Sequence, residues 1–173
     1  GITERSNSAV PIGPSAGLQE VPLAQLEEFY RSHDLPCQLM IPDRIGRPAE
    51  HLPGERGPEI LVMSKELGDS AVNPEQTPAP DAAPLAPPRL TVDGQLAAIT
   101  RATITDGWLG YSAVAVAPEF RRRGLGTLLC QHLLSWGADN GAEHAYLDVI
   151  DSNTAGKALY HKLGFSEHHR SRS

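Results

Sequence analysis

The residues best suited to chemistry form the run R-R-R-G-L-G-T, from Arg121 to Thr127. Two glycines in it, Gly124 and Gly126, let the backbone approach an oxygen-rich ligand closely. If the run opens a helix, the free N–H groups there carry partial positive charge and attract anions. Three cations stand beside those amides: Arg121, Arg122 and Arg123. The run therefore predicts a binding site for a phosphate-bearing cofactor.

The flanking sequence supplies the two elements that position this run. Before it, Trp108 to Ala117 alternate with the period of a β-strand. We place four of these side chains on one face of the strand: Trp108, Ser112, Val114 and Val116. After it, residues recur at the spacing of an amphipathic helix: Leu125, Leu128, Leu129, His132, Leu133 and Trp136. The run thus joins a strand to a helix, and this context strengthens a short motif.

The chain continues with a second strand and a second helix. His144 to Ile150 is a short apolar run typical of a strand, and Asp151-Ser152-Asn153 then offers side chains that cap helices. A helix is expected from about Thr154 to Leu163. It should end at Gly164, because glycine suits the left-handed cap.

The text L-D-V-I-D-S-N-T-A-G-K-A-L-Y-H-K-L-G-F resembles the second signature of the GCN5-related N-acetyltransferases, the GNAT superfamily. That signature has an asparagine, a tyrosine seven residues later and then Gly-Phe. The matching residues are Asn153, Tyr160, Gly164 and Phe165. Both signatures occur in the family's order, and the arrangement is similar to two-lobed actinobacterial members. The resemblance implies an acyltransferase enzyme with an α/β fold, in which helices flank a mixed central sheet.

Composition agrees with a small enzyme. The 173 residues carry a net charge of −6, which argues against a nucleic-acid-coating protein, and 40% apolar content is enough for a packed core. Cys37 and Cys130 do not define a disulfide framework. No signal peptide or membrane-length apolar run is visible, so we expect a cytoplasmic chain that binds neither membrane nor nucleic acid.

The sequence divides into a first lobe at residues 1–67, a linker at 68–89 and a motif-bearing lobe at 90–173. The linker holds six prolines and almost no large apolar residue, so we expect it to be extended or mobile. The first lobe has a predicted helix, Pro22 to Arg31, and predicted strands, Cys37 to Ile41 and Ile60 to Met63. Its element order echoes the second lobe without the Arg-x-x-Gly-x-Gly signature. We therefore interpret it as a degenerate GNAT-like half.

One departure concerns the segment ahead of the central hairpin. A complete GNAT fold has a strand and two helices there, and the helices usually wall the acceptor site. Here only residues 89–94 and the linker precede the predicted hairpin strand, Leu96 to Thr105. Either the first lobe and linker replace these helices, or the numbering joins pieces across a missing segment. The proline-rich linker favours the second explanation.

The resemblance implies acetyl-CoA as co-substrate. Its pyrophosphate would lie on the backbone N–H groups of Arg123 to Thr127, with the Thr127 hydroxyl as a further donor. Its pantetheine amides would pair with the strand at Val114 to Val116, as an added strand does, while the neighbouring strand at Tyr146 to Ile150 splays away. A backbone N–H near Val116 would stabilise the developing oxyanion. The implied cofactor-binding residues are Val114, Ala115, Val116, Arg121, Arg122, Arg123, Gly124, Leu125, Gly126, Thr127 and Asn153.

Tyr160 is the catalytic residue that the resemblance implies. A tyrosine of pKa about 10 can protonate the departing coenzyme A thiolate. Asn153 would contact the cofactor or hold the helix start. The general base for the acceptor amine stays open among three carboxylates: Asp148, Glu119 and Asp106. No metal is expected, because the adjacent histidines His168 and His169 have no carboxylate or cysteine at ligand spacing.

These residues together predict an N-acetyltransferase. It would move the acetyl group of acetyl-CoA to a primary amine by direct transfer in a ternary complex. The alternative is a non-catalytic sensor or regulatory module that binds acetyl-CoA. The sequence leaves open whether the acceptor is a small molecule or a protein amine, and whether the chain forms oligomers.

Overall fold

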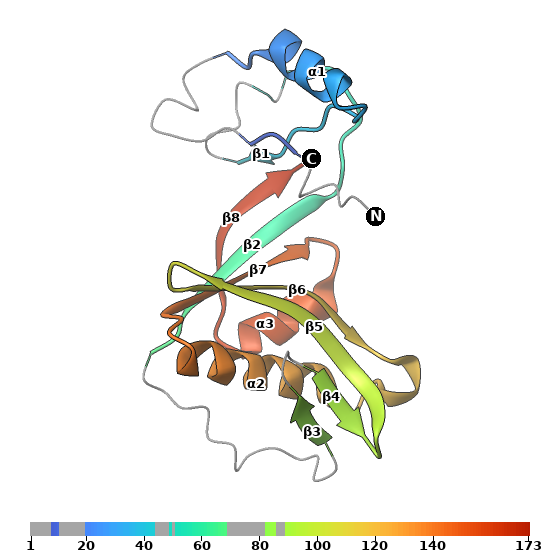
Figure 1. The fold of residues 1–173 in the computed structure, drawn as a ribbon, viewed down its shortest axis with the longest axis vertical. Coiled ribbons are helices and arrows are strands. Elements are labelled where there is room, and N and C mark those ends of the chain that lie inside the picture. The colour runs from blue at the N-terminus through green and yellow to red at the C-terminus, as the bar shows by residue number, and fades with distance from the viewer. Residues whose placement is uncertain (1–7, 11–19, 44–48, 50, 69–81, 86–88) are drawn as a thin grey trace. The chain divides into compact units, whose positions relative to one another are not determined.

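The structure is a computed structural model that describes residues 8–10, 20–43, 49, 51–68, 82–85 and 89–173. The chain forms two compact units. Unit 1 comprises Gly1–Val62, Val149–Thr154 and His168–Ser173, and unit 2 comprises Met63–Asp148 and Ala155–Glu167. Both units are assembled from segments that are distant in the sequence (Figure 1). Their limits therefore differ from the sequence division at residues 67 and 90.

The sheet has the strand order β1-β8-β2-β7-β6-β5-β4-β3 and contains parallel and antiparallel pairs. The elements in chain order are α1 (Leu23–Ser32), β1 (Ile41–Pro42), β2 (Glu59–Glu66), β3 (Ala82–Leu85), β4 (Arg89–Val92), β5 (Gln95–Thr105), β6 (Trp108–Val116), the 3₁₀ turn η4 (Pro118–Phe120), α2 (Leu125–Asp139), β7 (His144–Ile150), α3 (Thr154–Lys162) and β8 (Ser166–Arg172). The predicted α/β class with a mixed sheet is confirmed, and the predicted helices and strands of the motif-bearing lobe appear within a few residues of their expected ends.

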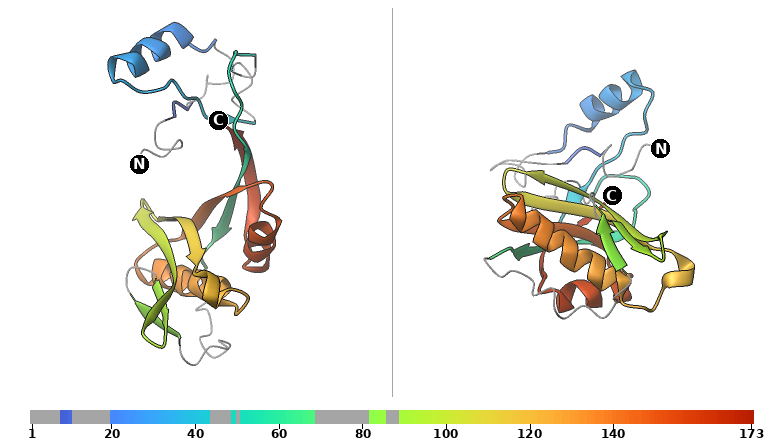
Figure 2. Two further views of the ribbon diagram at one scale, coloured as in Figure 1. Left: turned by 90° about the vertical axis from the view of Figure 1, so that its right-hand side faces the viewer. Right: turned by 60° about the horizontal axis from the view of Figure 1, so that its bottom comes forward.

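Unit 2 is built from antiparallel hairpins followed by a parallel crossover. β4 pairs with β5 and β5 with β6 in antiparallel fashion, and β6 then pairs in parallel with β7. Both hairpin turns, Asp93-Gly94 and Asp106-Gly107, have positive φ at their two central residues. That geometry matches the twist of the flanking strands. α2 forms the crossover from β6 to β7, which lie side by side (Figures 1 and 2).

Both helices of unit 2 lie on one face of its sheet. α2 contributes Leu125, Leu128 and Leu129 to a buried cluster with residues before it in the chain: Leu90, Val92, Ala97, Ala98 and Phe120. Further along α2, a Cβ placed at Gly137 would lie 2.6 Å from Leu109 Cδ2 on β6, so the helix and strand backbones approach closely there. Tyr160 on α3 contacts Tyr111 two residues on from Leu109, hence on the same face of β6.

A bulge in β6 changes which side chains share a face. The β5–β6 register shifts between Ile99 and Arg101, whose partners are Ala115 and Ser112, so β6 carries one extra residue. Of the four β6 residues predicted to share a face, Trp108 and Ser112 precede the bulge and are exposed. Val114 and Val116 follow it and pack against the core cluster. The prediction that these four residues share one face is therefore wrong, because the extra residue reverses the alternation.

Unit 1 contains α1 and the short strand β1. α1 matches the predicted helix and buries Tyr30, whose hydroxyl donates a hydrogen bond to the Gln38 carbonyl at 3.2 Å. The predicted strand from Cys37 to Ile41 is shorter than expected. Leu39 forms one isolated bridge with Ala9, and β1 begins only at Ile41. Pro36 and Pro42 flank this segment, and neither can donate to a strand ladder.

Part of the predicted linker belongs to the sheet. Ala82–Leu85 form β3, which pairs antiparallel with β4 at the edge of the sheet. These four residues are extended and pair through their backbone, which needs no large side chain, and Pro84 is tolerated on an edge strand. Positions 69–81 and 86–88 lie outside the described residues, as do positions 11–14, where the first lobe lacks the glycine signature.

Candidate active site

The start of α2 has the backbone geometry of an anion site. Gly124 precedes the helix in the left-handed conformation (φ 74°), and Arg122 also has a positive φ of 61°. The first i→i−4 bond of the helix runs from the Leu128 N–H to the Gly124 carbonyl at 3.0 Å. The N–H groups of residues 125–127 therefore have no acceptor within the helix. Among the residues that the structure describes, no side chain caps this end, and its first turn has no acidic residue, so the amides are available to an anion.

The three arginines lie at the surface around these amides. Arg121 Nε donates to the Val116 carbonyl at 3.2 Å, which ties the loop to the end of β6. The Arg123 guanidinium lies 5.6 Å from the centre of the buried Phe120 ring. Arg122 is exposed like its neighbours. The loop is thus anchored at both ends while its charges stay accessible.

The first turn of α2 packs against β6 and α3. A Cβ at Gly126 would make ordinary contacts, 3.8 Å from Val116 Cγ2 and 3.9 Å from Leu159 Cδ2. Leu125 is buried in the core with 3% exposure, so only its backbone can serve a ligand. Thr127 is half-buried in the same turn. Tertiary packing therefore fixes the direction of the free amides.

β6 has an open edge beside this helix start. The parallel register with β7 runs from Trp108–His144 to Tyr111–Leu147, and in the described part of the chain it goes no further. On the other edge, β6 stays paired with β5 as far as Val116. Val114 and Val116 are half-buried and Ala115 is exposed. A strand edge that loses its neighbour in this way can accept hydrogen bonds from an extended ligand.

Tyr160 lies in an aromatic cluster of unit 2. Its side chain is only 9% exposed, and its ring meets Tyr111 and Phe165 edge-on, each at 6.2 Å between centroids. Burial, with a smaller contribution from the Cys130 sulfur, raises the pKa of Tyr160 to about 12. The hydroxyl is therefore protonated at neutral pH, as a proton donor must be.

Two further residues of this cluster, Tyr111 and Cys130, were not predicted from the sequence to lie at the site. Tyr111 is buried, and its hydroxyl has no hydrogen-bond partner of good geometry among the described residues. The neighbouring Cys130, on α2, is fully buried, and burial raises the pKa of its thiol to about 12. Alternation along the strand could have indicated Tyr111, because it neighbours the exposed Ser112 and so projects from the opposite face. The sequence analysis placed Ser112 on the same face as Val114 and Val116, so it did not identify the face of Tyr111 as the buried one.

The three candidate general bases differ in burial and in position. Asp148 is half-buried on β7 and directly follows Leu147, the last residue paired with β6. Glu119 is exposed in η4. Asp106 is exposed in the β5–β6 turn, with a positive φ of 50°. Of the three, Asp148 alone stands at the point where β6 and β7 part.

Asn153 belongs to unit 1 in the structure. It is exposed, immediately precedes α3, and its N–H donates to the Ile150 carbonyl at 2.8 Å. This geometry agrees with a role at the helix start. Its contact with a cofactor stays a prediction.

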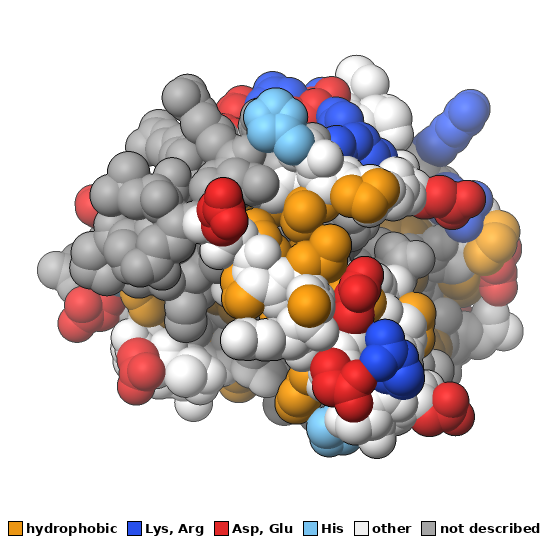
Figure 3. Space-filling model, turned by 90° about the horizontal axis from the view of Figure 1, so that it is seen from above, with side chains coloured by type: hydrophobic (Ala, Val, Ile, Leu, Met, Phe, Trp, Pro, Cys, Tyr) orange, Lys and Arg blue, Asp and Glu red, His pale blue; other side chains and the backbone are white. Residues whose placement is uncertain are grey.

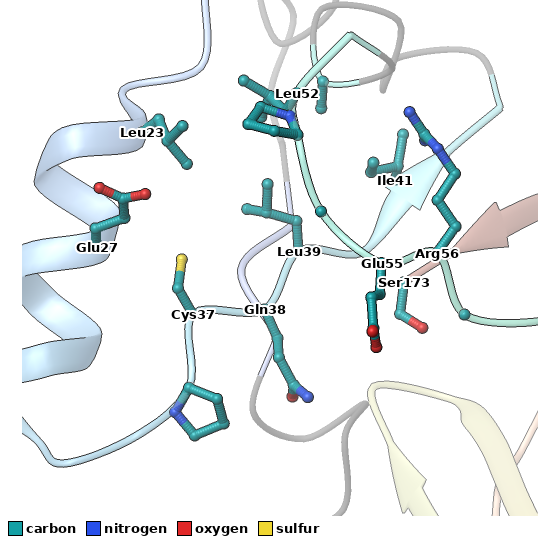
Figure 4. Close-up of a pocket in the computed structure, with 15 residues that line it drawn as sticks. Leu23, Glu27, Cys37, Gln38, Leu39, Ile41, Leu52, Glu55, Arg56 and Ser173 are labelled. Carbon is teal, nitrogen blue, oxygen red and sulfur yellow. The ribbon is translucent and has the colours of Figure 1, made fainter.

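Unit 1 has a cavity of its own, of about 440 Å³. Leu23, Leu39, Ile41 and Leu52 line it, with the Glu27 carboxylate at one side (Figure 4). None of the predicted site residues lines this cavity. The face that Figure 3 shows has clustered hydrophobic side chains with charged residues around them. Cys37 at the cavity is exposed, and a partial loss of solvent together with the charge of Glu27 raises the pKa of its thiol.

No group of three or more histidine, cysteine or acidic side chains among the described residues could hold a metal ion. No helix in the same ranges is long and apolar enough to span a bilayer.

Known proteins share this fold or resemble part of this sequence. The GCN5-related N-acetyltransferase from Kribbella flavida superposes with a TM-score of 0.66 at 19% identity, covering 87% of this chain and 72% of that one. The [Ribosomal protein bS18]-alanine N-acetyltransferase of Salmonella typhimurium is 41% identical over 81 residues, which are 46% of this chain and 53% of that protein. Fold and motifs therefore define a GNAT acetyltransferase domain.

A more specific match covers the whole chain. The family model described as "Probable histone acetyltransferase Rv0428c C-terminal" matches residues 1–173, and the chain belongs to this family. The Mycobacterium tuberculosis protein named "Probable histone acetyltransferase Rv0428c" is 33% identical over 194 residues, with 99% of this chain covered. The chain spans 63% of that relative's length.

Proposed function

We propose that this chain is an N-acetyltransferase that moves the acetyl group of acetyl-CoA to a primary amine by direct transfer in a ternary complex. The observation that carries the proposal is the juxtaposition of an uncapped helix start with the open edge of β6 in unit 2. The related proteins support it, because one is named a probable histone acetyltransferase and another a ribosomal-protein-alanine N-acetyltransferase.

The chain's backbone would hold the co-substrate. The amides of residues 123–127 would bind the pyrophosphate, with Thr127 as a further donor and the exposed arginines as counter-charges. Val114, Ala115 and Val116 would pair with the pantetheine amides along the open edge. A backbone N–H of this segment would stabilise negative charge on the thioester carbonyl oxygen. No metal enters this scheme.

Two side chains would move protons. An alkylammonium of pKa about 10.4 must lose a proton before it can attack, and we assign this task to Asp148 because it stands where β7 leaves β6. The amine nitrogen then bonds to the thioester carbon, the carbon–sulfur bond breaks, and the nitrogen releases its remaining extra proton to solvent. Tyr160, protonated in its buried position, would donate a proton to the departing thiolate.

Calorimetric titration with acetyl-CoA tests the binding part of the proposal. We expect one saturable site of micromolar affinity, which Gly124→Glu abolishes by placing bulk and negative charge at the phosphate. Gly94→Glu is the matched control, because Gly94 has nearly the same φ (76° against 74°) and equally open space around it. Equal affinity in the Gly124 and Gly94 variants would contradict the cofactor site.

Tyr160→Phe tests the catalytic part, with thiol release from acetyl-CoA as the assay. Loss of a general acid should lower kcat by about 100-fold or more while leaving the dissociation constant of acetyl-CoA unchanged. Undiminished turnover would remove Tyr160 from the mechanism. Tight binding without turnover of any amine by the unaltered chain would favour the sensor function instead.

A further inference from the structure

Three aromatic side chains form a cluster on the sheet of unit 2, which we call the aromatic platform: the exposed Trp108 and Tyr146 and the half-buried His144. Trp108 and Tyr146 are 40% and 42% exposed, although both are large hydrophobic residues. Trp108 stacks on His144 with 4.5 Å between ring centroids and 26° between planes, and meets Tyr146 edge-on at 6.2 Å. The cluster is therefore ordered by its own contacts while its rings remain accessible.

The strand register puts the platform on the face away from α2 and α3. Trp108 pairs with His144, and Gly110 pairs with Tyr146. The side chains of Trp108, His144 and Tyr146 therefore project on one side of the sheet. The alternate residues Leu109 and Tyr111 face the helices. Gly110 is needed here, because a Cβ at that position would lie 2.7 Å from the Tyr146 ring. The missing side chain lets this ring lie against the sheet.

The platform is continuous with the proposed catalytic base. Along β7, His144, Tyr146 and Asp148 alternate with the buried Ala145 and Leu147, so the first three share one face. At about 3.3 Å per strand residue, Asp148 lies roughly 7 Å along the strand from Tyr146 and 13 Å from His144. A substrate whose amine reaches Asp148 could therefore extend over the rings.

Charges near the platform suit a cationic substrate. Asp106 lies in the turn just before Trp108, and Glu143 directly precedes His144. Both carboxylates are exposed, and the Glu143 and His144 N–H groups both donate to the Gly107 carbonyl, which holds the two segments together. Arg101, opposite Ser112, is a cation on the same face, two strand residues beyond the level of Gly110 and Tyr146, toward the Asp148 end of the face.

We propose that the aromatic platform binds an arginine side chain of a polypeptide acceptor, at the second residue after the amine that is acetylated. This rests on the proposed function. In an extended peptide, residues two apart project on the same side about 7 Å from each other, which is the spacing between Asp148 and Tyr146. A planar guanidinium stacks on aromatic faces and is attracted by their negative charge. A linear polyamine has no planar group to stack, so the rings favour a guanidinium over its ammonium groups.

Paired peptides test the proposal. The unaltered chain and Trp108→Ala are compared on Ala-Gly-Arg-Gly-Gly and Ala-Gly-Gln-Gly-Gly, with thiol release as the assay. We expect the substitution to lower kcat/KM for the arginine peptide by about 3- to 10-fold and to leave the glutamine peptide within about twofold. Leu96→Ala is the control, because Leu96 is 50% exposed and lies on β5, outside the platform. Equal losses on both peptides, or the same loss in the Leu96 variant, would overturn the proposal.

A binding measurement separates this proposal from the proposed function. The N-acetylated arginine peptide is titrated by calorimetry in the presence of coenzyme A, which requires no turnover. Loss of affinity in Trp108→Ala and in Tyr146→Ala, with unchanged thermal unfolding, would support the platform even if no transfer is measured. Affinity unchanged in both variants would overturn it. Spermidine acetylation that falls as steeply as arginine-peptide acetylation would overturn the peptide assignment.

Discussion

At the residue scale, burial decides the chemistry of the groups around Tyr160. A tyrosine or thiol removed from water holds its proton more tightly, because the charged form loses its solvation. The pKa of Tyr111 is raised well above its ordinary value in this way, and those of Tyr160 and Cys130 are each raised to about 12. The cluster is thus neutral across the physiological range and presents donors rather than anions.

This burial predicts a loss of stability in alkali. Unfolded Cys130 would release its proton from about pH 9 and the unfolded tyrosines from about pH 10, whereas the folded groups retain theirs to about pH 12. The unfolded state therefore binds fewer protons in this window, so the free energy of unfolding should fall as pH rises from about 9 to 12. Urea titrations between pH 7 and 11.5 measure it.

Cys130→Ala is the control for this prediction. The variant lacks the thiol, so its fall should begin about one pH unit higher, where the tyrosines titrate. A free energy of unfolding that rises or stays level above pH 9 would contradict the assigned burial.

At the element scale, α2 connects the anion site to the sheet through two glycines with opposite surroundings. Gly126 in the first turn has room for a methyl group, whereas Gly137 near the last turn lies against the fully buried Leu109. The first glycine is not needed for packing, so its absence of a side chain suits close approach of a ligand. The second is needed for the contact between α2 and β6.

The same substitution should therefore have opposite effects at these two positions. Gly137→Ala would place its Cβ 2.6 Å from Leu109 Cδ2, and overpacking of this kind costs about 1–3 kcal/mol. Gly126→Ala should gain up to about 1 kcal/mol, because alanine loses less backbone freedom in a helix. Urea unfolding of both variants measures the difference. Changes of the same sign and size would show that the α2–β6 contact is looser than described.

At the scale of the whole molecule, the two cysteines report on the two units. Cys37 is exposed in unit 1, and Cys130 is buried in unit 2. A thiol reagent attacks only accessible thiolates, so accessibility and pKa together set the rate. The unaltered chain thus carries one reporter for the surface of unit 1 and one for the opening of unit 2.

We expect one thiol to react with a disulfide reagent in the native chain and both to react in urea. Glu27→Gln should speed the labelling of Cys37 by about twofold, because it removes a negative charge that raises the pKa of this thiol. Glu28→Gln is the control, since Glu28 pairs with Arg31. Labelling of Cys130 in the native chain at the rate of Cys37 would contradict its burial.

The sequence alone determined the order of the elements around the site. Arg121 and Gly124 lie between β6 and α2, and Gly126 lies in the first turn of α2; short-range geometry suffices to predict that arrangement. The capping side chains of residues 151–153 and the terminating Gly164 predicted the second helix in the same way. These inferences were confirmed as structure because each depends on residues within one or two turns of each other.

Tertiary structure decided what long-range pairing controls. The bulge opposite Thr100 reversed the facing of Val114 and Val116, and no local pattern in β6 announces an extra residue. The placing of Trp108 beside His144, 36 positions later, requires the parallel register of β6 with β7. Tyr111 became part of the Tyr160 cluster for the same reason. Local sequence fixes dihedral preferences and periodicity, but which faces meet depends on the register and burial that the folded chain reaches as a whole.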